Sequence, residues 1–295
     1  MKTIDLDSQI ENISKISLDR RKFFRQAGML GFGAAASGLL LSGAKAQAQE
    51  SSYAVEDTVA EIFTAFLIAE DLATTFYFNG LSGPVIQDPN LAGPGGSARN
   101  ITSSGNAGNV NYLQAALIEE IEHANLFRDL LTGAATGASA DPYQTFYFPE
   151  GTFTTLSTFL TYLNALENAF IGAYLILIQE MSAKAAAAIA GKLTGADAKY
   201  SAAEYENFAL IGASILGVES EHRVLGRVIG NNNPANNLNY EQLDGLASIY
   251  NGPKSAVVAL TPFLTPSTGP GYSLGTALAD WRLVTEGITT TGGQP

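Results

Sequence analysis

The sequence predicts an all-α fold, a four-helix bundle with one long crossover connection and an irregular C-terminal extension. Apolar residues recur at three- and four-residue steps in four long stretches, and segments rich in glycine, proline and asparagine separate them. Of the 295 residues, 46% are hydrophobic and 15% are charged, which is typical of a folded, apolar-rich chain. The absence of cysteine excludes disulfides, iron–sulfur clusters and thiol catalysis.

The first 48 residues have the pattern of an export signal. Arg20 and Arg21 precede two phenylalanines, and a weakly hydrophobic run follows that is too short and too rich in glycine for an ordinary membrane helix. The segment resembles a bacterial twin-arginine signal, with Asp19 where Ser or Thr is usual. We therefore expect a periplasmic or secreted protein without a stable membrane anchor after cleavage. The alternative interpretation is an N-terminal membrane anchor.

The net charge limits the possible partners. Removal of residues 1–48 takes away seven basic and four acidic residues, so the formal net charge changes from −12 to −15. Only nine Lys and Arg remain, which argues against nucleic acid as a partner. An acidic surface instead raises the local concentration of cations.

Four helices follow in order, each defined by its apolar stripe. The first is predicted from Val55 to Phe78, before an Asn-Gly pair, and the second from Asn109 to Leu131. The third is predicted from Thr154 to Ala190, and the fourth from Ala203 to Ile229. Turn-forming residues follow the first and third helices, so the four helices form two hairpin-like pairs.

The connection between the second and third helices predicts the topology. It is around twenty residues long and has no helical pattern, so it can stretch to about 66 Å, whereas a helix of 25 residues is about 38 Å long. It is therefore long enough to cross the whole bundle. We expect residues 49–230 to form the bundle and residues 231–295 to form an extension packed on it.

Both histidines of the chain lie in one local motif, Glu-x-Glu-His, at His123 and His222. Glu120 and Glu219, three residues before each histidine, interrupt the apolar stripe of their helices and share its face. Burial of a carboxylate beside an imidazole costs several kcal/mol unless something pairs with it, and almost no Lys or Arg lies nearby in the sequence. A divalent cation resolves this electrostatic problem.

The other two helices each offer one inward glutamate, Glu70 and Glu167. By contrast, Glu61 and Glu180 lie about 180° and 220° further round their helices. The Glu-to-Glu separations in the two halves are 50 and 52 residues, which indicates an internal repeat. The repeated positions are Glu70, Tyr77, Glu120 and His123 in one half and Glu167, Tyr174, Glu219 and His222 in the other.

One glutamate from each of two helices and Glu-x-x-His from each of the other two is the dimetal carboxylate pattern. The stretches "AEDLATTFYFNGL", "EEIEHANLFRDLL", "ALENAFIGAYL" and "GASILGVESEHRVLGR" resemble the bacterial ferritin-like domain family that includes plant desiccation-related proteins, over residues 55–230. The resemblance implies a ferritin-like bundle in which Glu120 and Glu219 bridge two ions and each histidine binds one. The implied ligands are Glu70, Glu120, His123, Glu167, Glu219 and His222.

Carboxylate oxygens with imidazole suit two divalent ions of Fe or Mn, with positions left open for dioxygen or peroxide. Two function classes stay open. The first is an exported dimetal oxidoreductase, of ferroxidase or manganese-catalase type, that acts on peroxide or ferrous iron in stress protection. The second is a non-enzymatic metal-binding or desiccation-protective protein. The sequence does not decide whether the chain forms a homo-oligomer.

The neighbouring polar residues have two interpretations each. Tyr77 and Tyr174 are core aromatics with satisfied hydroxyls or redox-active electron donors. Glu119, Glu122 and Glu221 point away from the apolar stripe, so they are solvated or contact a ligand side chain from outside.

Overall fold

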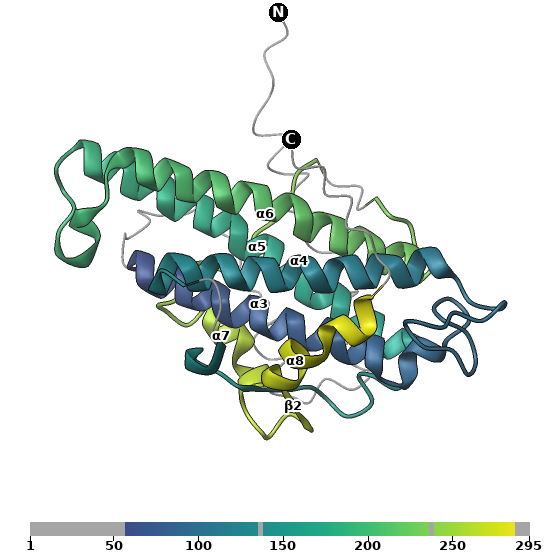
Figure 1. Cartoon of the computed structure of the whole chain (residues 1–295). Helices are drawn as coiled ribbons and strands as arrows, with labels where there is room; N and C mark the ends of the chain where they lie inside the picture. The colour runs from purple at the N-terminus through teal and green to yellow at the C-terminus, as the bar shows by residue number, and fades with distance from the viewer. Residues whose placement is uncertain (1–56, 135–137, 236–238, 287–295) are drawn as a thin grey trace, which may run out of the picture. The chain divides into compact units, whose positions relative to one another are not determined.

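A computed structural model describes residues 57–134, 138–235 and 239–286. Its framework is four long helices: α3 (Val59–Ser82), α4 (Ala107–Thr132), α5 (Leu156–Ile189) and α6 (Ala202–Ile229). α3 packs along α4, and α5 packs along α6, so the bundle consists of two helical hairpins (Figure 1). The predicted all-α four-helix bundle is confirmed.

Side-chain caps fix where the helices begin. The Thr58 hydroxyl accepts from the backbone N–H of Glu61, and the Glu61 carboxylate accepts from the backbone N–H of Thr58. Ser201 and Glu204 form the same reciprocal pair at the start of α6. α4 and α5 also begin at side-chain caps. Each cap satisfies backbone N–H groups that have no partner within the helix.

The first helix continues past the Asn-Gly pair at which the sequence predicted its end. Gly80 lies inside α3, and a Cβ at this position would lie 2.5 Å from Cε2 of Phe159. The glycine therefore allows the close approach of α5 rather than a helix stop. α3 ends at Ser82 with Gly83 as its C-cap, and the short 3₁₀ helix η1 (Pro84–Gln87) follows at once.

The chain between α4 and α5 crosses the length of the bundle, as predicted (Figure 1). α3 and α4 are antiparallel, since Phe63 near the start of α3 lies 5.8 Å from Phe127 near the end of α4, measured between ring centroids. At the end of the connection, the ring centroids of Phe153 and Phe76 lie 5.4 Å apart. The backbone carbonyl of Phe153 accepts from the backbone N–H of Val85. The connection thus runs from one end of α3 to the other.

Short elements within this connection join it to the C-terminal part of the chain. The connection contains the 3₁₀ turn η2 (Ala138–Ala140) and the strand β1 (Thr145–Tyr147). β1 pairs antiparallel with β2 (Gly271–Ser273), with Phe146 opposite Tyr272. The sequence showed no helical pattern in the connection but did not reveal this pairing.

The C-terminal part of the chain packs on the first hairpin. It contains α7 (Ala256–Leu260), η4 (Thr261–Leu264), β2 and α8 (Leu274–Thr285), and α8 lies against α3 and α4 (Figure 1). The Gln114 amide of α4 donates to the Val284 carbonyl at 2.6 Å and fixes the end of α8. The domain boundaries at residues 48 and 230 stay predictions.

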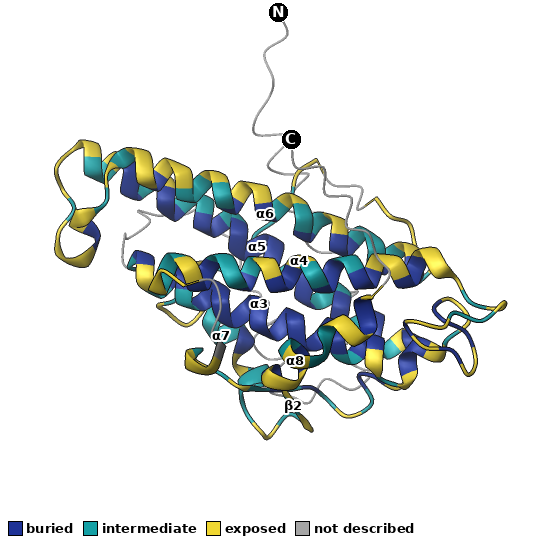
Figure 2. Cartoon of the chain, in the orientation of Figure 1, coloured by how far each residue is buried: buried dark blue, intermediate teal, exposed yellow. Residues whose placement is uncertain are grey.

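Burial is uneven among the four helices. Nearly all of α3 is buried, whereas α6 exposes its outer face to solvent (Figure 2). Among the described helices, α5 is the one whose length and composition would allow it to cross a membrane. Most of α5 is buried within the protein, and Glu167 and Lys184 are among its buried residues. α5 is therefore a core helix of the bundle.

Two carboxylates hold the segment before α7 against the bundle. The Asp57 carboxylate accepts from the backbone N–H groups of Ile249, Tyr250 and Asn251 at 2.7–3.1 Å. Glu180 also accepts from the Ile249 N–H, at 3.3 Å. The sequence placed Glu180 on the far side of α5 from Glu167, and the expectation that α5 has one inward glutamate is incomplete. The structure buries both, because the C-terminal segment covers the side of α5 where Glu180 lies.

Stability is expected to depend on the protonation of Glu180. Burial and then the charge of Asp57 raise the pKa of Glu180 from 4.5 to about 7. The folded state therefore binds a proton that the unfolded state has lost, and stability falls as pH rises from about 4.5 to about 7. Glu180→Gln, which keeps an acceptor oxygen and has no charge, should be more stable than wild type at pH 8 by about 1–3 kcal/mol.

Urea unfolding at pH 5 and pH 8 measures this difference. The advantage of Glu180→Gln should shrink toward zero at pH 5, while Glu122→Gln, an exposed change on α4, should shift stability little at either pH. An equal advantage at both pH values would contradict the protonation of Glu180 in the folded protein.

Candidate metal centre

The structure brings the six predicted ligand residues together in the middle of the bundle. Each of the four helices supplies part of the set: Glu70 from α3, Glu120 and His123 from α4, Glu167 from α5, and Glu219 and His222 from α6. The spacing of three residues puts each Glu-x-x-His pair on one helix face. All but His123 are fully buried, and the His123 side chain is 12% exposed.

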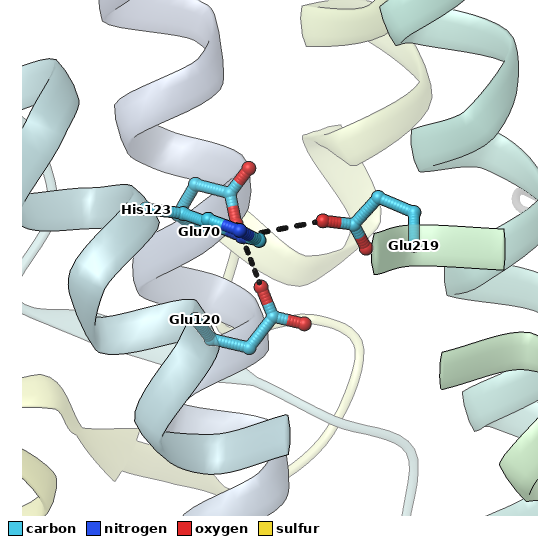
Figure 3. A group of neighbouring side chains, drawn as sticks. All are labelled: Glu70, Glu120, His123 and Glu219. Atoms are coloured by element: carbon cyan, nitrogen blue, oxygen red, sulfur yellow. Dashed lines mark ion pairs between the residues drawn. The ribbon is translucent and has the colours of Figure 1, made fainter. Parts of the chain in front are cut away.

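The side chains form two groups, each around the Nδ1 atom of one histidine. His123 Nδ1 lies 3.5 Å from Glu70 Oε2, 3.4 Å from Glu120 Oε2 and 3.4 Å from Glu219 Oε1 (Figure 3). The second group consists of His222, Glu120, Glu167 and Glu219. In each group the candidate ligand atoms all lie within 4.8 Å of one another.

Glu120 and Glu219 belong to both groups. One oxygen of Glu120 faces His123, and the other lies 3.0 Å from His222 Nδ1. Glu219 divides its two oxygens in the same way, at 3.4 Å from His123 Nδ1 and 3.6 Å from His222 Nδ1. This is the arrangement that two bridging carboxylates require.

The atoms that face the centre have no hydrogen-bond partner in the protein. They are Glu70 Oε2, both oxygens of Glu120, His123 Nδ1, Glu167 Oε2, both oxygens of Glu219 and His222 Nδ1. Buried polar atoms left without partners cost about 1–3 kcal/mol each, and more when charged. Ligands of one ion about 2.1 Å away lie about 3.0–3.5 Å apart, close to the separations around His123. The donor set therefore fits divalent cations.

Two tyrosines connect the halves of the centre. The Tyr77 hydroxyl of α3 donates to Glu167 Oε1 at 2.6 Å, and the Tyr174 hydroxyl of α5 donates to Glu70 Oε1. Burial, and then the charge of the glutamate that each contacts, raise the pKa of both phenols well above 10. Both hydroxyls therefore keep their protons, and each turns the second oxygen of its glutamate toward the centre.

Glu119 lies closer to the site than the sequence alone could show. Its carboxylate is 2.9 Å from His222 Nε2, although the side chain is 47% exposed. Glu122 and Glu221 are exposed. The contact joins α4 to α6, so no spacing within one helix reveals it.

Buried basic residues lie near the centre in sequence, but each pairs with other acidic groups. Arg128 pairs with Asp71 and, at 2.7 Å, with Asp141. Arg223, next to His222, pairs with Glu241. These guanidinium groups therefore balance other carboxylates and not those of the cluster.

When no metal is bound, protons balance part of the negative charge of the clustered carboxylates. Burial, and then the charges of Glu120 and Glu219, raise the pKa of Glu70 well above its usual value. Burial and then the charge of Glu219 raise the pKa of Glu167 in the same way. Both carboxyl groups therefore hold their protons to higher pH than a glutamate in water does.

The two histidines also hold their protons to higher pH than usual. Burial by itself lowers the pKa of an imidazole, but the facing carboxylates, Glu120 foremost, raise the pKa of His123 and His222 well above 6.5. In return, burial raises and the two imidazoles lower the pKa of Glu120, which falls well below its usual value. The raised pKa values of both histidines and of Glu70 and Glu167 thus favour bound protons, which offset the negative charge of the four carboxylates.

Two divalent ions would replace the positive charge that protons supply in the metal-free protein. We therefore expect the binding of two ions at pH 7 to release protons, and affinity to fall as pH falls, because the ligands must lose their protons first. Calorimetric titrations in buffers of different ionisation enthalpy count the protons. Release of fewer than one proton per bound ion would contradict the protonation described above.

The fold and site together define a ferritin-like bundle with a carboxylate and histidine cluster able to hold metal. A family model described as "Ferritin-like domain" matches residues 58–208, just over half of the chain. The chain therefore belongs to the ferritin-like domain family. The match ends within α6, before Glu219 and His222, so the assignment of these two residues rests on the sequence repeat and on the geometry. Comparisons with curated proteins and with solved structures give no match.

Proposed function

We propose that this protein holds two divalent ions, Fe or Mn, and acts on peroxide or ferrous iron in stress protection. The observation that supports it is the set of buried ligand atoms without protein partners, contributed by all four helices. Paired carboxylates and two imidazoles suit Fe and Mn better than softer metals. Six protein ligands for two ions leave coordination positions open for an oxidant.

Each residue of the set has a defined role in this proposal. Glu120 and Glu219 would each help to hold both ions, because each directs one oxygen toward His123 and the other toward His222. Glu70 and Glu167 would each hold one ion, since a tyrosine hydroxyl already contacts one oxygen of each. When bound, a pair of redox-active ions supplies the two electrons that peroxide or dioxygen chemistry moves.

The tyrosines hold the terminal glutamates in place. Any electron donation by Tyr77 would require its phenolic proton to move, and Glu167 Oε1 at 2.6 Å is placed to accept it. Tyr174 and Glu70 form the equivalent pair.

Export belongs to the same proposal. The twin-arginine interpretation concerns residues 1–48, which lie outside the described residues. Twin-arginine export carries proteins that are already folded, which suits a centre assembled from four helices before transport. The likeness to desiccation-related proteins supports a protective role in the periplasm or outside the cell.

Replacement of both signal arginines tests the export route. Arg20→Lys with Arg21→Lys should hold the precursor in the cytoplasm, because this route depends on the arginine pair. Cell fractionation measures it. Normal accumulation outside the cytoplasm would remove the twin-arginine interpretation.

Loss of a bridging residue tests the centre itself. Glu120→Ala should lower bound metal from two ions to fewer than one per chain, because both groups lose a ligand, while circular dichroism shows unchanged helix content. Glu122→Ala removes the same charge from an exposed position on the same helix and should keep both ions. Metal analysis of purified protein gives the count, and full occupancy in Glu120→Ala would overturn the ligand assignment.

Turnover separates the two function classes. Protein loaded with Fe or Mn should disproportionate hydrogen peroxide or oxidise Fe(II) with saturable kinetics, and Glu120→Ala should lose this activity with its metal. Metal-loaded protein that turns over neither substrate faster than free metal would favour the non-enzymatic, protective alternative.

A further inference from the structure

One contact distinguishes the two halves of the metal centre. His222 is 1% exposed, and its two ring nitrogens face in different directions. Nδ1 faces Glu120 and Glu219 inside the bundle, and Nε2 lies 2.9 Å from the Glu119 carboxylate. Glu119 is on α4 and His222 is on α6, so the contact spans the two helices.

The other half lacks the equivalent carboxylate. Alignment of the two Glu-x-x-His motifs places Val218 at the position of Glu119. Valine has no acceptor for an imidazole N–H. Among the residues that the structure describes, no hydrogen bond to His123 Nε2 is found, and the His123 ring is the more exposed of the two.

This difference has a direct effect on how each histidine presents its ligand atom. A carboxylate that accepts from one ring nitrogen fixes the tautomer and the ring orientation, and it makes the other nitrogen a better metal ligand. For His222 the nitrogen so directed is Nδ1, which faces Glu120 and Glu219. His123 has the same inward Nδ1 without this support.

The contact also joins two helices that belong to different hairpins. α4 and α6 touch each other far less than either touches its hairpin partner. A bond from Glu119 to His222 therefore restrains the distance between two helices that each carry a bridging glutamate, Glu120 and Glu219.

We propose that Glu119 is a positioning residue that makes the two metal positions unequal. The ion held by Glu120, Glu167, Glu219 and His222 binds more tightly than the ion held by Glu70, Glu120, His123 and Glu219. The inference rests on the proposed dimetal function and adds an order of filling to it. Glu119 acts through His222 and contacts no ion itself.

Titration of metal-free protein with Mn²⁺ tests the order, with free Mn²⁺ measured by electron paramagnetic resonance. Wild type should show one tight and one weaker site. Glu119→Ala should weaken the tight site about 10- to 100-fold and leave the weaker site nearly unchanged, so the two affinities converge. Glu119→Gln keeps an acceptor oxygen, so its affinity at the tight site should lie between those of wild type and Glu119→Ala.

Two further variants separate positioning from general effects. Glu122→Ala removes one negative charge from the exposed side of the same helix and should leave both affinities as in wild type. Val218→Glu supplies a carboxylate at the equivalent position of the other half and should tighten the weaker site. Circular dichroism establishes that each variant is folded.

Different failures have different meanings. Two equal affinities in wild type, or unchanged affinities in Glu119→Ala, would overturn the role of Glu119 and leave the dimetal proposal standing. If Glu119→Ala and Glu122→Ala each weakened both sites to the same extent, the cause would be the change in net charge. That result would also overturn the role of Glu119. A wild-type protein that binds no Mn²⁺ and no Fe(II) would remove both proposals.

Discussion

The repulsion among four carboxylates in the bundle interior is the constraint on which the rest of the site depends. Glu70, Glu120, Glu167 and Glu219 are all buried, and the atoms that face one another lack hydrogen-bond partners. Carboxylates so placed destabilise the fold unless positive charge accompanies them. Protons on the ligands or two divalent ions provide that charge, and this choice couples stability, pH and metal binding.

The buried basic residues do not supply the positive charge that balances the central carboxylates. Arg128 pairs with Asp71 and Asp141, and Lys184 pairs with Asp197 at 2.6 Å. Each of these cations is thus neutralised where it lies. The charge that balances the central carboxylates comes from the imidazoles, protons or metal.

The repeat in the sequence accounts for the symmetry of the site. Tyrosine–glutamate hydrogen bonds between the two halves join them into one centre. Tyr77 of the first half contacts Glu167 of the second, and Tyr174 contacts Glu70 in return. Because each half supplies the hydroxyl that the other half needs, neither hairpin contains a complete centre. The break in the symmetry at Glu119 gives the two halves different surroundings.

Helical periodicity predicted most of the fold and placed each of the six candidate ligands on the apolar face of its own helix, because spacing within a helix fixes direction. It failed where distant segments meet. Gly80 has the appearance of a helix stop but accommodates Phe159. Glu180 appears to face outward until the C-terminal segment covers it, and the contact of Glu119 with His222 depends on how α4 and α6 pack. These features depend on contacts between segments that lie far apart in the sequence, so no local sequence pattern predicts them.

An anomalous difference map from crystals of metal-loaded protein tests the central claim most directly. Two peaks are expected, one among Glu70, Glu120, His123 and Glu219 and the other among Glu120, Glu167, Glu219 and His222. Data collected on either side of the metal absorption edge identify the element in each peak. A map of fully loaded protein with no peak between these side chains, or with its metal bound elsewhere on the chain, would rule out the dimetal centre.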